Sequence, residues 1–162
     1  MPNHWWRERE YSSMSGSAFR IWLTTSLRQG VWAPGLVLAF WAVAAKGFDA
    51  FIKYPNLDIP THLFGGLASA YFFDVCIVNL RYALGQIHVY LRLALSFSLV
   101  AVIAICWEFA EFLSDLFLGS HLNLGVPDTL GDLFFGLVGA SCFVILRLVQ
   151  HGIAAESSEC SR

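Results

Sequence analysis

The stretch WEFAEFLSDLFLGSHLNLGVPDTLGD, residues 107–132, decides the fold of this chain, because acids at helical spacing stand there between two apolar segments. Spacings of three and four residues place each set of acids on one face of a helix. The acids are Glu108, Glu111 and Asp115 in the first segment and Asp128 and Asp132 in the second. Carboxylates are costly in apolar surroundings, and this cost makes them candidates for function.

The chain around this stretch is too apolar for an ordinary soluble domain. Of its 162 residues 57% are hydrophobic, and the mean hydropathy is +0.60. We therefore predict an integral membrane protein that contacts the lipid bilayer. The formal net charge is −2, and no basic patch interleaved with aromatic residues is present in the sequence, which excludes nucleic acid as a partner.

Four apolar segments are each long enough, at about 20 residues, to cross a hydrocarbon layer of about 30 Å. They are residues 31–52, 60–84, 89–118 and 128–150. Their short connections predict an all-α polytopic fold, a four-transmembrane-helix up-and-down bundle over residues 31–150. Residues 1–30 are predicted to be a cytoplasmic tail with a short interfacial helix, or alternatively a partly ordered tail. Residues 151–162 are predicted to be a cytoplasmic C-terminal tail.

A cleavable signal peptide is the alternative interpretation of the first segment, because VWAPGLVLAFW is followed by the small residues AVAA. The long preceding region contains acids, and the segment continues to a spanning length through Phe51. Both features favour a membrane span.

Basic residues predict the orientation. Arginines precede the first segment, flank the second connection and lie near the end of the chain, whereas only Lys46 and Lys53 border the first connection. The positive-inside rule then predicts cytoplasmic N and C termini in the cell (inner) membrane. It follows that His62, His121 and the acids of several helices converge at the non-cytoplasmic end. These acids are Asp49, Asp58, Glu108, Glu111, Asp115, Asp128 and Asp132.

The motif DIPTH supplies a second part of this polar cluster, because it places Asp58 and His62 one helical turn apart. Small residues continue the same helix faces and allow close helix approach, so the polar side chains should point into the bundle. The small residues are Gly66, Ala70, Ala101, Ala104, Gly136 and Ala140. Asp128 stands at a helix start, where a capping or first-turn role is expected, whereas Asp132 lies one turn deeper.

Several carboxylates that face one another need compensation, from a bound cation, from retained protons, or from Lys46 and Lys53. We predict a divalent metal ion of undetermined identity, with candidate ligands Asp58, His62, Glu108, Glu111 and Asp132. Oxygen ligands alone suit Mg²⁺, Ca²⁺ or Mn²⁺, and His62 would also admit zinc or iron. The candidate catalytic residues for envelope or small-molecule chemistry are Glu108, Glu111 and His62.

Two other functions stay open. One is a proton- or cation-coupled transporter that works as a homo-oligomer and uses Glu108 and Glu111 as a relay. The other is a non-catalytic accessory subunit of a membrane complex. A purely structural hydrogen-bond network is the alternative to a functional site.

Two further features are predicted to be structural. Asp74, inside the second segment, is expected to form an ion pair with Arg81 or Arg147. The four cysteines stand singly, without a CxxC pair, and are expected to be packing residues.

The motifs DIPTH, WEFAE and DTLGDLFFGLVGA resemble those of the YjdF-type small polytopic membrane proteins, a family of unknown function. The resemblance covers residues 58–140. It implies matching positions at Asp58, His62, Glu108, Glu111, Asp128, Thr129, Asp132, Gly139 and Ala140. The chain is more loosely similar to the VanZ-like family, which is linked to glycopeptide resistance at the cell envelope and has other polar and basic residues in place of WEFAE.

Overall fold

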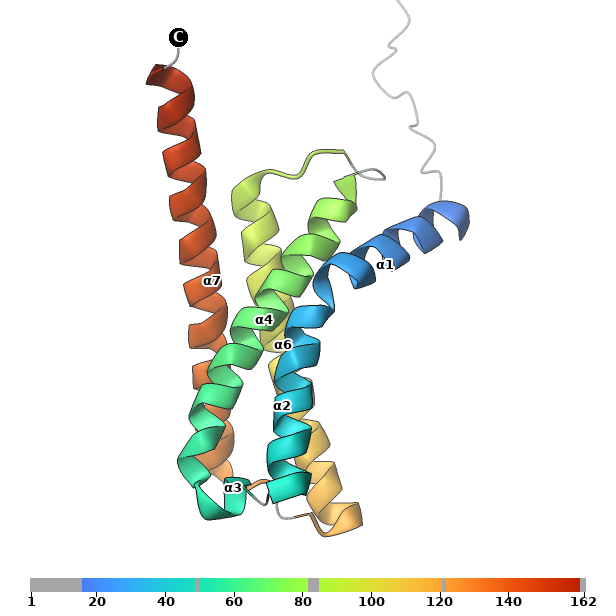
Figure 1. Ribbon diagram of the computed structural model, residues 1–162, viewed down its shortest axis with the longest axis vertical. Coiled ribbons are helices and arrows are strands. Elements are labelled where there is room, and N and C mark those ends of the chain that lie inside the picture. Colours follow the sequence, from blue (N-terminus) through green and yellow to red (C-terminus); the bar gives the residue numbers. More distant parts are fainter. Residues whose placement is uncertain (1–15, 49, 82–84, 121, 161–162) are drawn as a thin grey trace, which may run out of the picture.

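The computed structural model describes residues 16–48, 50–81, 85–120 and 122–160, and these form an all-helical fold (Figure 1). The helices are α1 (Gly16–Gly30), α2 (Trp32–Phe48), α3 (Ala50–Lys53), the short 3₁₀ turn η1 (Pro55–Leu57), α4 (Asp58–Asn79), α6 (Val89–Leu118) and α7 (Val126–Cys160). The predicted all-α polytopic fold class is confirmed.

Within the described residues, three helices are long and apolar enough to cross a membrane, namely α4, α6 and α7 up to Ala154. Helices α1 and α2 meet this requirement only together, as a pair bent by 56°. The described chain therefore has three candidate spans, or four if the bent pair counts as one. With 17 residues, α2 alone is about 25 Å long, somewhat less than the hydrocarbon thickness of about 30 Å.

Helix α1 forms in the region where either an interfacial helix or a partly ordered tail was expected, and it packs on α4. The Trp22 indole N–H donates a hydrogen bond to the Cys76 carbonyl oxygen over 2.8 Å. The Asn79 side-chain amide donates to the Ser26 hydroxyl over 3.2 Å. These polar contacts fix α1 at an angle to α2.

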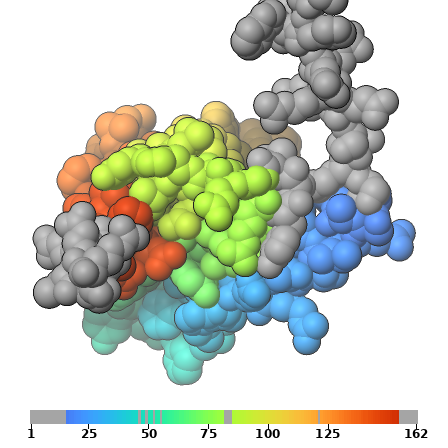
Figure 2. All heavy atoms as spheres, turned by 90° about the horizontal axis from the view of Figure 1, so that it is seen from above, coloured from blue at the N-terminus to red at the C-terminus, as the bar shows by residue number. Residues whose placement is uncertain are grey.

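Chain direction alternates along the bundle, as predicted (Figure 1). Helices α2 and α6 run toward the end that carries α3, whereas α4 and α7 run away from that end. Seen along the bundle, α1 and α7 lie on opposite sides of α4 and α6 (Figure 2). Because α4 and α7 run in the same direction, they are parallel, and they pack against each other more extensively than any other pair of the described helices.

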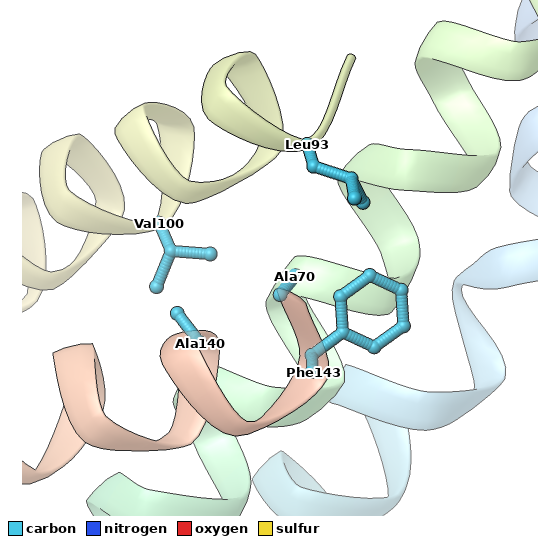
Figure 3. Packing of buried hydrophobic residues seen from close by; sticks show 5 residues of the cluster. All are labelled: Ala70, Leu93, Val100, Ala140 and Phe143. Carbon is cyan, nitrogen blue, oxygen red and sulfur yellow. The ribbon is translucent and has the colours of Figure 1, made fainter. Parts of the chain in front are cut away.

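Small residues permit this close packing of α4 on α7. A Cβ atom on Gly66 would overlap the carbonyl oxygen of Gly136, and one on Gly139 would overlap that of Leu63. The contact therefore requires glycine at Gly66 and Gly139, and the predicted close approach at small residues is confirmed for Gly66 and Gly136. Figure 3 shows the buried core beside it, contributed by α4, α6 and α7. Its residues are Ala70, Leu93, Val100, Ala140 and Phe143.

A buried ion cluster lies at the end of the bundle away from α3. Asp74 is only 3% exposed, and its two carboxylate oxygens lie 2.8 Å from Arg92 Nε and 3.2 Å from an Arg147 guanidinium nitrogen. The predicted contact with Arg147 is confirmed. Arg92, near the start of α6, is a further partner of Asp74 that was not predicted.

Candidate metal centre

Five polar side chains from three helices meet at the end of the bundle near α3, the lower end in Figure 1. We call this group the acidic centre. Its members are Asp58 and His62 of α4, Glu108 and Glu111 of α6, and Asp132 of α7. All five were predicted as ligands, and the structure brings them together.

The glycine contact between α4 and α7 positions two members of the acidic centre. His62 lies one turn before Gly66 on α4, and Asp132 lies one turn before Gly136 on α7. Because the two helices are parallel and touch at these glycines, the side chains one turn earlier face each other. His62 Nε2 lies 3.5 Å from an Asp132 oxygen and 3.3 Å from an oxygen of Asp58, its neighbour on α4.

Helix α6 adds two carboxylates that are as deeply buried as Asp132. Glu108 and Glu111 are each 7% exposed, and Asp132 is 5% exposed. The Trp107 indole N–H donates a hydrogen bond to Glu111 Oε1 over 2.8 Å. The Trp107 ring is held in turn by an edge-on contact with Trp41, at a centroid distance of 5.3 Å.

Two overlapping triads of ligand atoms result, and Asp132 belongs to both. One oxygen from each of Glu108, Glu111 and Asp132 can be chosen so that all three lie within 4.8 Å of one another. The same limit holds for Asp58, His62 and Asp132. The first triad offers only oxygen ligands, whereas the second adds an imidazole nitrogen.

The charge of the acidic centre is poorly compensated by the described residues. Glu108 Oε2 is buried and has no hydrogen-bond partner there. Among the described side chains, only His62 lies at ion-pair distance from these acids. A buried charged oxygen without a partner costs several kcal/mol.

Of the two lysines that were considered as compensation, Lys53 forms no ion pair with these acids among the described residues. Lys53 donates a hydrogen bond to the Phe48 carbonyl oxygen over 2.8 Å and is exposed. The side chain of Lys46 lies outside the described part of the chain.

Two of the predicted converging acids serve the α6–α7 connection instead. The Asp115 carboxylate accepts hydrogen bonds from the backbone N–H groups of Leu122 and Asn123, over 2.7 and 2.9 Å. Asp128 lies in the first turn of α7, one of the two roles expected for it, and accepts a hydrogen bond from the Leu124 N–H over 2.9 Å. Asp49 and His121 lie outside the described residues.

Sequence reasoning missed the part played by Trp107. Its position four residues before Glu111 was a usable signal, because residues four apart on a helix are neighbours. An indole that donates to a buried carboxylate fixes that side chain without neutralising it.

Comparison with known proteins identifies the family. A family model described as "Predicted membrane protein (DUF2238)" matches residues 12–152, which include all of the acidic centre. This is the YjdF family, so that resemblance is confirmed. No curated protein and no solved structure matches the chain significantly. The chain thus belongs to the DUF2238 family of predicted membrane proteins.

Proposed function

We propose that this membrane protein binds a divalent cation in the acidic centre, between α4, α6 and α7. The observation that carries the proposal is the buried Glu108 oxygen, which has no hydrogen-bond partner among the described residues and lies in a cluster of carboxylates. A cation would supply the missing partner and reduce the repulsion among these acids.

The donor set favours a hard cation. Glu108, Glu111 and Asp132 offer buried oxygens, which suit Mg²⁺, Ca²⁺ or Mn²⁺. Asp58 and His62 complete the proposed ligand set, and the imidazole nitrogen would raise the affinity for Mn²⁺, Fe²⁺ or Zn²⁺ relative to Mg²⁺. With His62 as a ligand, Asp132 would join the two triads around one ion.

Such a cation would serve envelope or small-molecule chemistry at the non-cytoplasmic face of the membrane. The ion would polarise a bound oxygen group or water, with Glu108, Glu111 and His62 as the proposed catalytic residues. The orientation rests on the positive-inside rule and on the arginines near the ends of the predicted spans, of which Arg92 and Arg147 pair with Asp74 at the end of the bundle away from the acidic centre.

Metal analysis tests the proposal directly. The full chain is purified in mild detergent, equilibrated in turn with Mg²⁺, Ca²⁺, Mn²⁺ or Zn²⁺, and dialysed, and its metal content is measured by mass spectrometry. We expect on the order of one ion per chain for at least one of these metals.

Matched variants assign that ion to the acidic centre. Glu108→Gln and Asp132→Asn should each lose it. Asp128→Asn makes the same change of charge in the neighbouring turn at a side chain that belongs to neither triad, so it should bind as the wild type does. No bound metal in any condition, or equal loss in Asp128→Asn, would overturn the proposal.

A further inference from the structure

A cavity of about 390 Å³ adjoins the acidic centre on its α2 side. Its walls come from α2, α4 and α6, with Gly136 of α7 at one place. On α4 the lining runs from Thr61 to Phe73, which is about 18 Å of helix. The cavity is therefore elongated along the bundle, and its volume falls within the range of about 300–1,000 Å³ that is usual for small-molecule sites.

The cavity wall is apolar over nearly all of this length. Its polar side chains are Thr61, His62 and Ser69. Thr61 already donates its hydroxyl to the Leu57 carbonyl oxygen over 2.7 Å, and His62 faces Asp58 and Asp132. Aliphatic and aromatic side chains cover the rest, so the wall suits a hydrocarbon chain.

Two side chains belong both to the cavity wall and to the acidic centre or its support. His62 lines the cavity and lies within 3.5 Å of Asp132. Trp107 lines it too, and its N–H donates a hydrogen bond to Glu111. One end of the cavity is thus the wall of the proposed cation site.

We propose that the cavity holds the hydrocarbon chain of an amphiphile whose anionic phosphate or carboxylate head meets the cation in the acidic centre. This inference rests on the proposed cation site, because carboxylates alone would repel an anionic head. A hard cation bound by protein carboxylates commonly keeps positions for oxygens of a phosphate ligand. Such an amphiphile would be the substrate class of the protein.

The head must supply the selectivity in this arrangement. A hydrocarbon chain gains little by leaving lipid for an apolar cavity, since lipid tails are equally apolar. The cavity would therefore fix the position of the chain, and the cation would choose the head.

Glycine positions offer a clean way to block the cavity. A Cβ atom on Gly65 has only an ordinary contact with Val37, at 3.9 Å, so Gly65→Leu would fill the cavity without striking the backbone. Gly35 on α2 has open space around it and does not line the cavity, which makes Gly35→Leu the matched control.

Tryptophan fluorescence gives the test, because Trp41 and Trp107 line the cavity. The probes are single-chain alkyl phosphate, alkyl carboxylate and alkyltrimethylammonium compounds with bromine near the chain end, which quench tryptophan on contact. They are added to the full chain in lipid nanodiscs, with cation or with chelator. The other tryptophans are replaced by phenylalanine, namely Trp5, Trp6, Trp22 and Trp32.

We expect saturable quenching by the phosphate or the carboxylate probe in the presence of the cation. The ammonium probe, the chelator and Gly65→Leu should each weaken it at least about tenfold, whereas Gly35→Leu should leave it unchanged. Equal quenching by all three heads, or unchanged quenching in Gly65→Leu, would overturn the inference and indicate bulk lipid.

Metal content measured on the same samples separates the two proposals. If the chain binds a cation but shows no preference among heads, the amphiphile inference fails and the cation site stands. If the chain binds no cation, both fail, whatever occupies the cavity.

Discussion

Asp74 and Glu108 are both buried acids at opposite ends of one bundle, but only Asp74 has arginine partners among the described residues. Two guanidinium groups reach Asp74 from α6 and α7. Glu108 instead faces two other deeply buried acids, Glu111 and Asp132. The same three helices therefore build one compensated acid and one acidic cluster that lacks compensation.

The difference separates a structural acid from the proposed cation site. A buried acid with paired arginines can be explained by structure alone, since it joins three helices. The acidic centre has one ion-pair partner among the described side chains, His62, and an indole donor, Trp107, while its like charges repel one another. The cost of this repulsion is offset when a ligand of opposite charge binds, which is the basis of the proposed function.

Breaking the Asp74 cluster should have the largest effect on stability. Arg92→Met removes the closer guanidinium from a carboxylate that is 3% exposed, so the free energy of unfolding should fall by about 3 kcal/mol. Adding Asp74→Asn should recover part of this loss, because the buried charge is then gone. Unfolding in mixed detergent micelles measures both variants, with the exposed Arg20→Met as control. The absence of any recovery would show that Arg92 acts through packing.

Separating α4 from α7 should come next in size. Gly66→Ala places a methyl group against the Gly136 backbone, and the free energy of unfolding should fall by about 1–3 kcal/mol. Gly65→Ala has room and should change it by less than about 1 kcal/mol, in the stabilising direction, since alanine favours helix. The same unfolding assay compares the two. Equal effects of the two substitutions would mean that the close contact between α4 and α7 does not contribute to the stability of the bundle.

Changing the histidine should alter the choice of metal. His62→Gln removes the nitrogen ligand but keeps the oxygens, so the affinity for Mn²⁺ or Zn²⁺ should fall by about 10–100-fold and that for Mg²⁺ or Ca²⁺ by less. Competition titrations of the purified chain measure the ratio. An unchanged ratio would place His62 outside the ligand set and leave it as a partner of Asp132.

The smallest effect is expected from the support of Glu111. Trp107→Phe keeps an aromatic ring against Trp41 but removes the N–H that donates to Glu111. The cation affinity should fall by about fivefold, which corresponds to about 1 kcal/mol for one hydrogen bond. The same titration tests it, with Trp32→Phe as the control at a tryptophan remote from the acidic centre.

Local and periodic features were predictable from the sequence. The third span, residues 89–118, coincides with α6, and the small residues predicted a close helix approach, which the structure places at Gly66 and Gly136 between α4 and α7. Charge asymmetry predicted that Asp58, His62, Glu108, Glu111 and Asp132 share one end of the bundle, and the structure brings them together. These features depend on helix periodicity and chain direction, which sequence reports directly.

Features that depend on how helices cross were not predictable. The boundary between α1 and α2 lies where the sequence separates the interfacial helix from the first span, but the 56° bend there depends on contacts of α1 with Asn79 and the Cys76 carbonyl of α4, far away in sequence. The pairing of Arg92 with Asp74 and the cavity beside His62 likewise depend on rotations of whole helices. Asp115 shares a helix face with Glu108 and Glu111, yet the backbone of the following loop captures its carboxylate.

The central claim is that a cation compensates the acidic centre, and the sign of one stability change tests it. Glu108→Gln removes a buried charge from a cluster of like charges, so with chelator present the variant should unfold at a higher temperature than the wild type. With the preferred cation present the order should reverse, because the wild type is stabilised by a ligand that the variant binds poorly. The measurement is the unfolding temperature of both proteins in the same detergent, with and without cation. A variant that is more stable in both conditions, or a wild type that does not respond to any divalent cation, would contradict the account.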